Sequence, residues 1–141
     1  MLKNIPSALS PDLLKVLMEM GHGDEIVIAD GNFPAASNAK ILIRCDSLNV
    51  VDLLEPILNF FPLDTFEKSP VIVMQVEKGD NYDPTIWSLF RTTIAKHFQE
   101  FDDFDFLDRK SFYKRAKQSY AIIATSETHR YANIILRKGI L

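Results

Sequence analysis

The histidine at position 22 stands between two glycines, Gly21 and Gly23, directly after a stretch with helical spacing. Glycine leaves the backbone uncrowded, so a ligand could come close to the imidazole at this point. An imidazole can accept a proton near pH 7 and return it, which general acid–base catalysis requires. The alternative is that the glycines only end the helix, leaving His22 on the surface near the negative end of the helix dipole.

Asp30 and Arg109 are charged residues that the pattern places at element boundaries. Asp30 ends an apolar segment, where an aspartate commonly forms a turn by bonding to its own backbone. Arg109 begins a predicted helix, where the helix dipole disfavours a cation. Arg109 could pair with Asp105 or Asp108, or it could bind a ligand, and the sequence leaves both possibilities open.

Two tyrosines and an asparagine extend this set of polar candidates. Tyr113 follows Arg109 by one helical turn and shares its face, although an aromatic stripe with Phe112 is more often part of the core than a ligand contact. In the segment "RYANIILRK", Tyr131 and Asn133 would point to one side of an extended chain. Phenol and amide groups donate and accept hydrogen bonds without a net charge, which suits a neutral polyol.

The stronger signatures of catalysis and metal binding do not occur in the sequence. It contains no glycine-rich phosphate loop, no G-x-S-x-G and no H-E-x-x-H. The three histidines and the single cysteine, Cys45, lack the spacing of metal ligands. His97 and His129 are expected to be solvated, and no partner base is identifiable for Cys45. Metal-dependent and covalent catalysis are therefore less favoured.

The composition is that of an ordinary globular chain: 141 residues, 47% hydrophobic and 25% charged, with a net charge of −3. Lysine and arginine are spread along the chain, which argues against nucleic-acid binding and against a polybasic membrane anchor. A single cysteine allows no intrachain disulfide, and the first ten residues do not resemble a signal peptide. No apolar run approaches the roughly 20 residues of a membrane span. We expect a cytoplasmic protein without nucleic-acid or membrane partners.

Alternating helix and strand patterns must position these candidates. Helices are predicted at 11–20, 50–60, 83–99 and 109–119, and strands at 25–30, 40–44, 71–77, 120–125 and 133–138. Ser10 and Asn49 are suitable caps for the first two helices, and Pro56 should kink or shorten the second. The apolar strands favour a sheet covered on both faces. We predict one α/β layered domain over residues 1–141, with a sheet flanked by helices; the pattern does not specify the strand order.

Taken in order, the segments "MGHGDEIVIAD.NFP", "LDTF", "R..FY.RA" and "YAN.ILRKG" closely resemble the L-fucose mutarotase and D-ribose pyranase family. The resemblance runs over essentially the whole chain. Arg109 is typical of the fucose branch, whereas the ribose branch tends to carry histidine there. The resemblance implies a sugar isomerase that interconverts the α and β anomers of L-fucose by opening and reclosing the hemiacetal ring. It implies neither a metal nor a redox cofactor.

The resemblance also implies roles for individual residues. His22 would be the proton donor or shuttle, and Tyr113 matches a tyrosine implicated in the animal fucose mutarotases. The residues that would contact the sugar are Asp30, Asp64, Arg109, Tyr131 and Asn133. We further expect the strand after His22 to carry Asp30 toward the same site.

Two other functions stay open beside the fucose mutarotase. A D-ribose pyranase would use the same histidine and aspartate in a pocket of different shape. A monosaccharide-binding protein without turnover would keep Asp30, Arg109 and Asn133 but could lose His22. The resemblance to the family also implies a ring-like homo-oligomer, commonly a decamer, with sites near subunit contacts. The apolar C-terminal segment "ILRKGIL" fits such an interface or, equally, a strand buried in its own subunit.

Two residues depart from the family pattern. Ala132 stands where glycine is frequent and would cost about 1 kcal/mol if its φ angle were positive. Pro56 interrupts a helix that relatives continue with ordinary helix formers, which we expect to affect packing and not chemistry.

Overall fold

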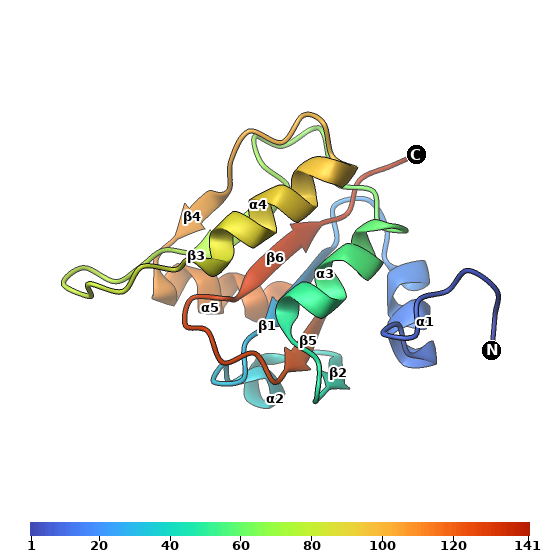
Figure 1. Ribbon diagram of the computed structural model, residues 1–141, viewed down its shortest axis with the longest axis horizontal. Coiled ribbons are helices and arrows are strands. Elements are labelled where there is room, and N and C mark those ends of the chain that lie inside the picture. Colours follow the sequence, from blue (N-terminus) through green and yellow to red (C-terminus); the bar gives the residue numbers. More distant parts are fainter.

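All six strands of the chain join one mixed sheet in the order β2-β5-β1-β6-β3-β4 (Figure 1). The computed structural model describes residues 1–141. The strands are β1 (Glu25–Ala29), β2 (Leu42–Cys45), β3 (Val71–Met74), β4 (Asp105–Leu107), β5 (Ala121–Thr125) and β6 (Ile134–Arg137). β6 runs antiparallel to its neighbours β1 and β3, whereas the remaining pairs are parallel. Residues that follow β1, β3 and β4 therefore meet residues that precede β6, at what we call the carboxyl end of the sheet. Residues that precede β1 meet those that follow β6 at the opposite, amino end.

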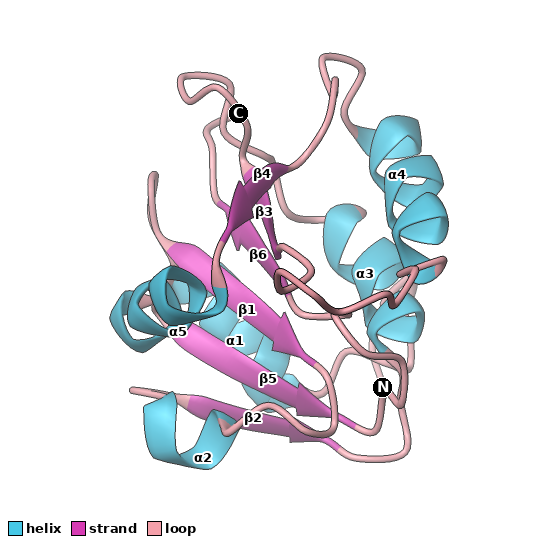
Figure 2. Ribbon diagram, turned by 90° about the vertical axis from the view of Figure 1, so that its left-hand side faces the viewer, coloured by secondary structure: helices cyan, strands magenta, loops and turns pink.

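Helices cover both faces of this sheet, as the uninterrupted apolar strands predicted. They are α1 (Pro11–Glu19), α2 (Ala35–Asn38), α3 (Val50–Leu58), α4 (Ile86–His97) and α5 (Arg109–Gln118). Figure 2 shows α2 and α5 on one side of the sheet and α3 and α4 on the other. The face under α1, α3 and α4 carries the larger buried cluster, and a smaller cluster lies under α2 and α5. The predicted α/β fold is confirmed.

Local sequence signals set the beginnings of three helices. The Ser10 hydroxyl accepts a hydrogen bond from the Leu13 N–H at 3.2 Å and caps α1. The Asn49 N–H donates to the Asp52 carboxylate at 2.9 Å at the start of α3. Asp108 caps α5. Pro56 lies inside α3, which ends at Leu58, two residues before the predicted end.

Several element boundaries differ from the prediction. The segment "GNFPAASN", residues 31–38, which we expected to form a loop, contains α2, a single turn in which the Asn38 amide donates to the Pro34 carbonyl at 2.7 Å. β4 was not predicted, because a three-residue strand paired only with β3 is too short to show a periodic pattern. β3 ends at Met74, before the predicted 77, and the Glu77 N–H donates to the Tyr131 hydroxyl instead of to a neighbouring strand. α4 begins at Ile86, three residues later than predicted.

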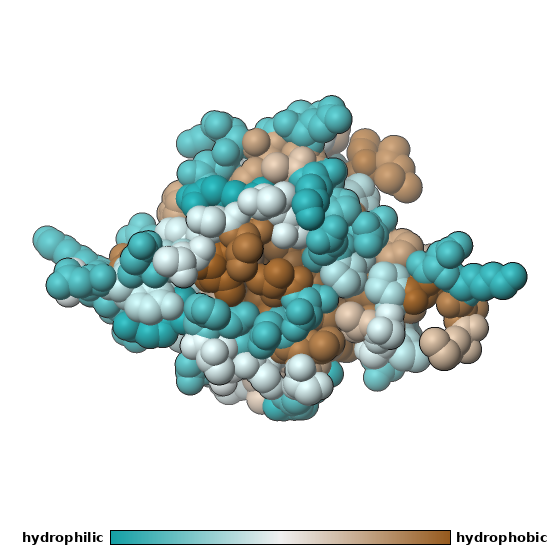
Figure 3. All heavy atoms as spheres, viewed as in Figure 1, coloured by the Kyte–Doolittle hydropathy of each residue, from teal (hydrophilic) through white to brown (hydrophobic).

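The face that carries α3 and α4 has an apolar hollow in its middle (Figure 3). A groove at the N-terminal ends of these helices is lined in part by Val51, Ile86 and Leu89. Further large apolar side chains are exposed elsewhere, among them Phe66 and the C-terminal Ile140 and Leu141. None of the helices is long and apolar enough to cross a membrane.

Candidate functional site

A cleft of about 360 Å³ opens at the carboxyl end of the sheet, where β1 and β3 end and β6 begins. Its polar lining includes Asp30, Glu77, Asp80, Arg109, Tyr113 and Tyr131. Ligands of open α/β sheets commonly bind beyond the carboxyl ends of the strands, and the volume is in the range of small-molecule sites. Four of the seven residues singled out from the sequence therefore line one cleft.

Asp30 is held in this cleft by Asn133, the first residue before β6. The Asn133 amide donates to Asp30 Oδ2 at 2.9 Å, and its Oδ1 accepts the Asp30 N–H at 2.8 Å. Burial raises the pKa of Asp30 above its ordinary value, and the hydrogen bonds from Asn32 and Asn133 only partly offset this effect. Asn133 itself is buried behind Asp30 and does not line the cleft. Asn133 therefore orients the carboxylate that faces the cleft.

Tyr131 is fixed at both its side chain and its backbone. Its hydroxyl donates to Asp80 Oδ2 at 2.7 Å and accepts the Glu77 N–H at 3.3 Å, while its carbonyl accepts from Trp87 Nε1 at 2.8 Å. Burial and the Asp80 carboxylate raise the pKa of Tyr131, so its phenol stays a hydrogen-bond donor at neutral pH.

The backbone of Tyr131 is left-handed, with a φ of 57°, so the chain is not extended at this residue. Ala132 packs in the larger core on the other face of the sheet, whereas Tyr131 lines the cleft and Asn133 binds the cleft residue Asp30. Ala132 has no positive φ angle, and the cost expected for alanine at this position does not arise. The unfavourable conformation is instead carried by Tyr131, which its three hydrogen bonds hold in place.

Arg109 pairs with neither of the acids proposed for it. Its Nε lies 2.8 Å from Glu77 Oε1 in an ion pair, while Asp108 is occupied as the cap of α5. Both partners are substantially exposed, at 63% for Arg109 and 48% for Glu77. A ligand could therefore replace Glu77 as the partner of Arg109 at little cost.

Tyr113 and Phe112 divide the two roles that the sequence left open. Phe112 is fully buried in the core, whereas Tyr113 reaches the cleft. The Tyr113 ring packs edge-on against Phe33 with 5.0 Å between ring centroids. Its hydroxyl makes no hydrogen bond within the chain and is available to a ligand.

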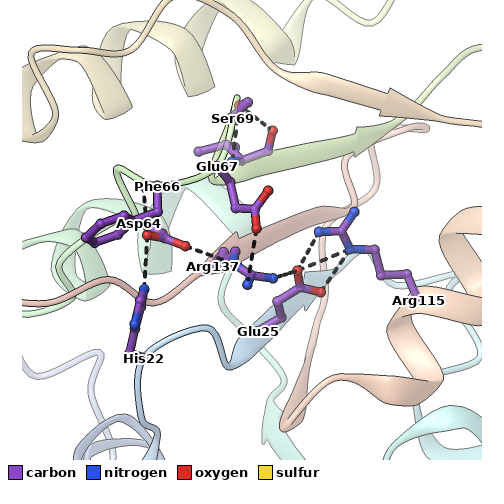
Figure 4. Close-up of polar contacts among 9 residues, drawn as sticks. His22, Glu25, Asp64, Phe66, Glu67, Ser69, Arg115 and Arg137 are labelled. Atoms are coloured by element: carbon purple, nitrogen blue, oxygen red, sulfur yellow. Dashed lines mark hydrogen bonds and ion pairs between the residues drawn. The ribbon is translucent and has the colours of Figure 1, made fainter.

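His22 and Asp64 lie in contact with each other at the amino end of the sheet (Figure 4), and neither lines the cleft. His22 precedes β1 and Asp30 follows it, and the run from Glu25 to Asp30 alone spans roughly 16 Å. The expectation that β1 carries Asp30 toward the site of His22 is therefore wrong within one chain. An extended strand separates its two ends instead of bringing them together.

Asp64 is the centre of a network of polar contacts at this end (Figure 4). Its Oδ1 lies 3.2 Å from His22 Nε2 and accepts the Phe66 N–H at 3.0 Å, while its Oδ2 accepts from Arg137 Nε at 2.9 Å. Burial acts to raise the pKa of Asp64, but the hydrogen bonds from Phe66, Arg137 and His22 outweigh it and hold the pKa below its ordinary value. Asp64 is therefore ionised at neutral pH.

Sequence reasoning did not single out Glu77, Asp80 or Arg137. Glu77 and Asp80 lie in a polar loop whose pattern carries no signal of a site. Arg137 did carry a signal, since it is a charged residue at the end of an otherwise apolar strand.

His97, His129 and Cys45 lie outside the cleft and outside the network of polar contacts around Asp64. His129 is 54% exposed and lies 2.7 Å from the buried Glu127 carboxylate, and His97 lies 3.8 Å from Glu55. Burial raises the pKa of the Cys45 thiol, which makes it a weak nucleophile near neutral pH. No three His, Cys, Asp or Glu side chains are grouped so that they could hold a metal ion.

Comparison with known proteins assigns the chain to a family. Residues 3–141 match the model of the RbsD / FucU transport protein family. The chain belongs to this family. An L-fucose mutarotase of Histophilus somni is 44% identical to it over 140 residues, which are 99% of this chain and 97% of that protein.

Two solved structures of the RbsD / FucU family allow a comparison of folds. The fucose mutarotase of Streptococcus pneumoniae, crystallised in complex with L-fucose, is 52% identical and matches with a TM-score of 0.95 over 99% of both chains. RbsD of Bacillus subtilis, complexed with D-ribose, is 26% identical and matches with a TM-score of 0.75 over 100% of this chain and 99% of that one. Within the family, the chain is therefore more similar to this fucose mutarotase than to this ribose-binding relative.

Proposed function

We propose that the protein is an L-fucose mutarotase, an isomerase that interconverts the α and β anomers of L-fucose. The observation that carries this proposal is the likeness to the S. pneumoniae fucose mutarotase, which extends over 99% of both chains. The lower likeness to the ribose-complexed B. subtilis protein disfavours a D-ribose pyranase. The protein would act in the cytoplasm on a free sugar, without a metal or a redox cofactor.

The cleft residues would bind the sugar. Arg109 would leave Glu77 and donate to a sugar hydroxyl, and the buried Asp30 carboxylate would accept from another. The free Tyr113 hydroxyl is close enough to the cleft to bind the sugar or to transfer a proton. Tyr131 would close the cleft from the β6 side.

His22 would supply the proton transfers, and a second copy of the chain would bring it to the cleft. Within one chain His22 and the cleft lie at opposite ends of β1. A contact between the amino end of one copy and the carboxyl end of the next uses two different surfaces, and such a contact generates a ring when its rotation closes. The exposed Phe66, whose ring lies 5.4 Å from the His22 ring, provides an apolar contact beside it. We therefore include a ring-like homo-oligomer, a decamer as in the family, in the proposal.

The reaction needs no group beyond these side chains. The anomeric hydroxyl gives a proton to the base, the bond between C1 and the ring oxygen breaks as the C1 carbonyl forms, and the ring oxygen takes a proton. After rotation about the C1–C2 bond the same steps run in reverse, so no proton is consumed. One positioned acid–base group typically accelerates such a step by about 10²- to 10⁴-fold.

Saturation-transfer NMR between the α and β anomers of L-fucose tests this function, with D-ribose measured in parallel. We expect fast anomer exchange with L-fucose that is lost in His22→Ala. The matched control His97→Ala, which lies outside the cleft and outside the Asp64 network, should keep this exchange. Exchange only between the ring forms of ribose would identify a pyranase. Sugar binding without accelerated exchange of either sugar would identify a binding protein and refute the enzyme.

A further inference from the structure

The buried carboxylate of Asp64 lies between His22 and Arg137 (Figure 4). Its side chain is only 1% exposed, and both of its oxygens have partners. An ionised carboxylate accepts hydrogen bonds and cannot donate them. The hydrogen shared across the 3.2 Å between Asp64 Oδ1 and His22 Nε2 must therefore belong to the histidine.

We propose that Asp64, held in place by Arg137, keeps the neutral His22 ring in the tautomer that carries its proton on Nε2, so that Nδ1 is the atom that exchanges protons with the sugar. Nδ1 makes no hydrogen bond within the chain, and 45% of the His22 side chain is exposed. A carboxylate on one ring nitrogen determines the tautomer and leaves the other nitrogen for chemistry. The catalytic part of this inference rests on the proposed function.

Asp64 would then act on the sugar through His22 and not by direct contact. Neither of its oxygens is free, and the side chain is closed to solvent. The resemblance to the family implied that Asp64 contacts the sugar, whereas these contacts favour Asp64 as a positioning residue. The Phe66 ring, tilted by 52° against the His22 ring, restricts the same imidazole from another side.

Arg137 is itself held by two other acids, which keeps its guanidinium in one orientation. The antiparallel pairing of β1 and β6 places Arg137 directly opposite Glu25, with 3.5 Å between the charged groups. Glu67 lies 3.4 Å from the same guanidinium, and Arg115 donates to Glu25 at 3.0 Å. Asp64 thus receives a fixed donor on the oxygen that faces away from His22.

The tautomer can be read directly from the ¹⁵N chemical shifts of the imidazole nitrogens at a pH where the ring is neutral. The chain has only three histidines, so His97→Gln and His129→Gln assign the His22 signals by elimination. We expect a protonated shift for Nε2 and an unprotonated shift for Nδ1 in the unmodified protein. A proton on Nδ1, or equal populations of both tautomers, would overturn the inference without any variant being needed.

Asp64→Ala removes the acceptor and leaves Arg137 with Glu25 and Glu67. We expect both tautomers of His22 to become populated and kcat for fucose exchange to fall by about 10- to 100-fold, short of the ~10⁴-fold upper range for an acid–base group. KM should change little, because Asp64 does not contact the sugar. The matched control is Asp103→Ala, which removes the partner of Arg91 outside the cleft and outside the Asp64 network. It should change neither the His22 tautomer nor kcat.

Arg137→Lys keeps a cation beside Asp64, whereas Arg137→Met does not. The lysine variant should retain more of the Nε2–H tautomer and more of kcat than the methionine variant. A loss of kcat in Asp64→Ala with an unchanged tautomer would refute the positioning role. An Nε2–H tautomer in a protein without mutarotase activity would refute the proposed function and leave the tautomer assignment standing.

Discussion

At the scale of single residues, the Arg109–Glu77 ion pair shows how the cleft can be charged and still accept a neutral sugar. Both side chains are largely solvated, so their ion pair is weak and either side chain can leave it to bind a ligand. Asp30 differs, since it is buried and held by Asn133. The cleft therefore combines a fixed hydrogen-bond acceptor, the Asp30 carboxylate, with a mobile donor, the Arg109 guanidinium.

Replacing Arg109 with methionine separates binding from stability. We expect KM for L-fucose to rise about tenfold to a hundredfold, since hydrogen bonds to charged groups contribute ~1.5–3 kcal/mol. The free energy of unfolding should change by less than about 1 kcal/mol, because the ion pair is exposed. Arg44→Met, which breaks the similarly exposed pair with Asp46, is the control and should leave KM unchanged. An unchanged KM in Arg109→Met would remove this residue from the binding site.

At the scale of elements, β6 connects the cleft with the network of polar contacts around Asp64. It begins just after Asn133 at the cleft and ends at Arg137 beside Asp64. The chain then continues past residues 62–64, where the Gly139 N–H donates to the Pro62 carbonyl at 2.8 Å. This close approach of two backbones sets the position of Asp64.

Gly139→Ala should disturb this contact. A Cβ atom at residue 139 would lie 2.5 Å from the Leu63 carbonyl oxygen and 2.8 Å from the Asp64 Cα, so the backbone must shift. We expect a loss of about 1–3 kcal/mol in the free energy of unfolding, together with reduced kcat, because Asp64 would move relative to His22. Gly21→Ala, whose added Cβ would come no closer than 3.8 Å to Asp24, is the control for chemical denaturation. Equal stability of the two variants would contradict the close packing at Gly139.

At the scale of the whole molecule, the separation of His22 from the cleft makes oligomerisation part of the proposed catalysis. In a ring where each site combines two neighbouring copies, His22→Ala removes the proton-transfer group from one half of a site, and Arg109→Met weakens sugar binding in the other half, which impairs exchange at fucose concentrations below KM. Mixed rings formed by co-expressing the two variants should regain activity in about a quarter of their sites. Saturation transfer on the mixed rings measures this, with separately prepared variants as controls. Activity no higher than that of the separate variants would contradict a site shared between copies.

The dependence of stability on pH should reflect the opposite pKa shifts of Asp64 and Asp30. The native pKa of Asp64 is lowered, so its contribution is complete above the ordinary value of 3.8 and is lost as the pH falls through the native value. The native pKa of Asp30 is raised, so its contribution is present below 3.8 and is lost as the pH rises through its native value.

Urea denaturation on either side of pH 3.8 checks the Asp64 part of this prediction. The unmodified protein should lose more stability on acidification than Asp64→Ala, which lacks the titrating group. An equal loss in both proteins would show that Asp64 does not contribute to the acid sensitivity.

The sequence by itself determined the features that depend on neighbouring residues. The caps Ser10 and Asn49 start their helices through bonds that span three residues, and apolar strands require a sheet covered on both faces. The types and order of the polar residues were also enough to indicate the family and to select residues that line the cleft.

Only the tertiary structure decided which of these residues meet. Strand order depends on packing between distant segments, so no local pattern could show that β6 lies between β1 and β3. That order brings Asn133 to Asp30 and places Arg137 beside Asp64. The separation of His22 from Asp30 does not depend on this order, because it follows from the extended length of β1 alone.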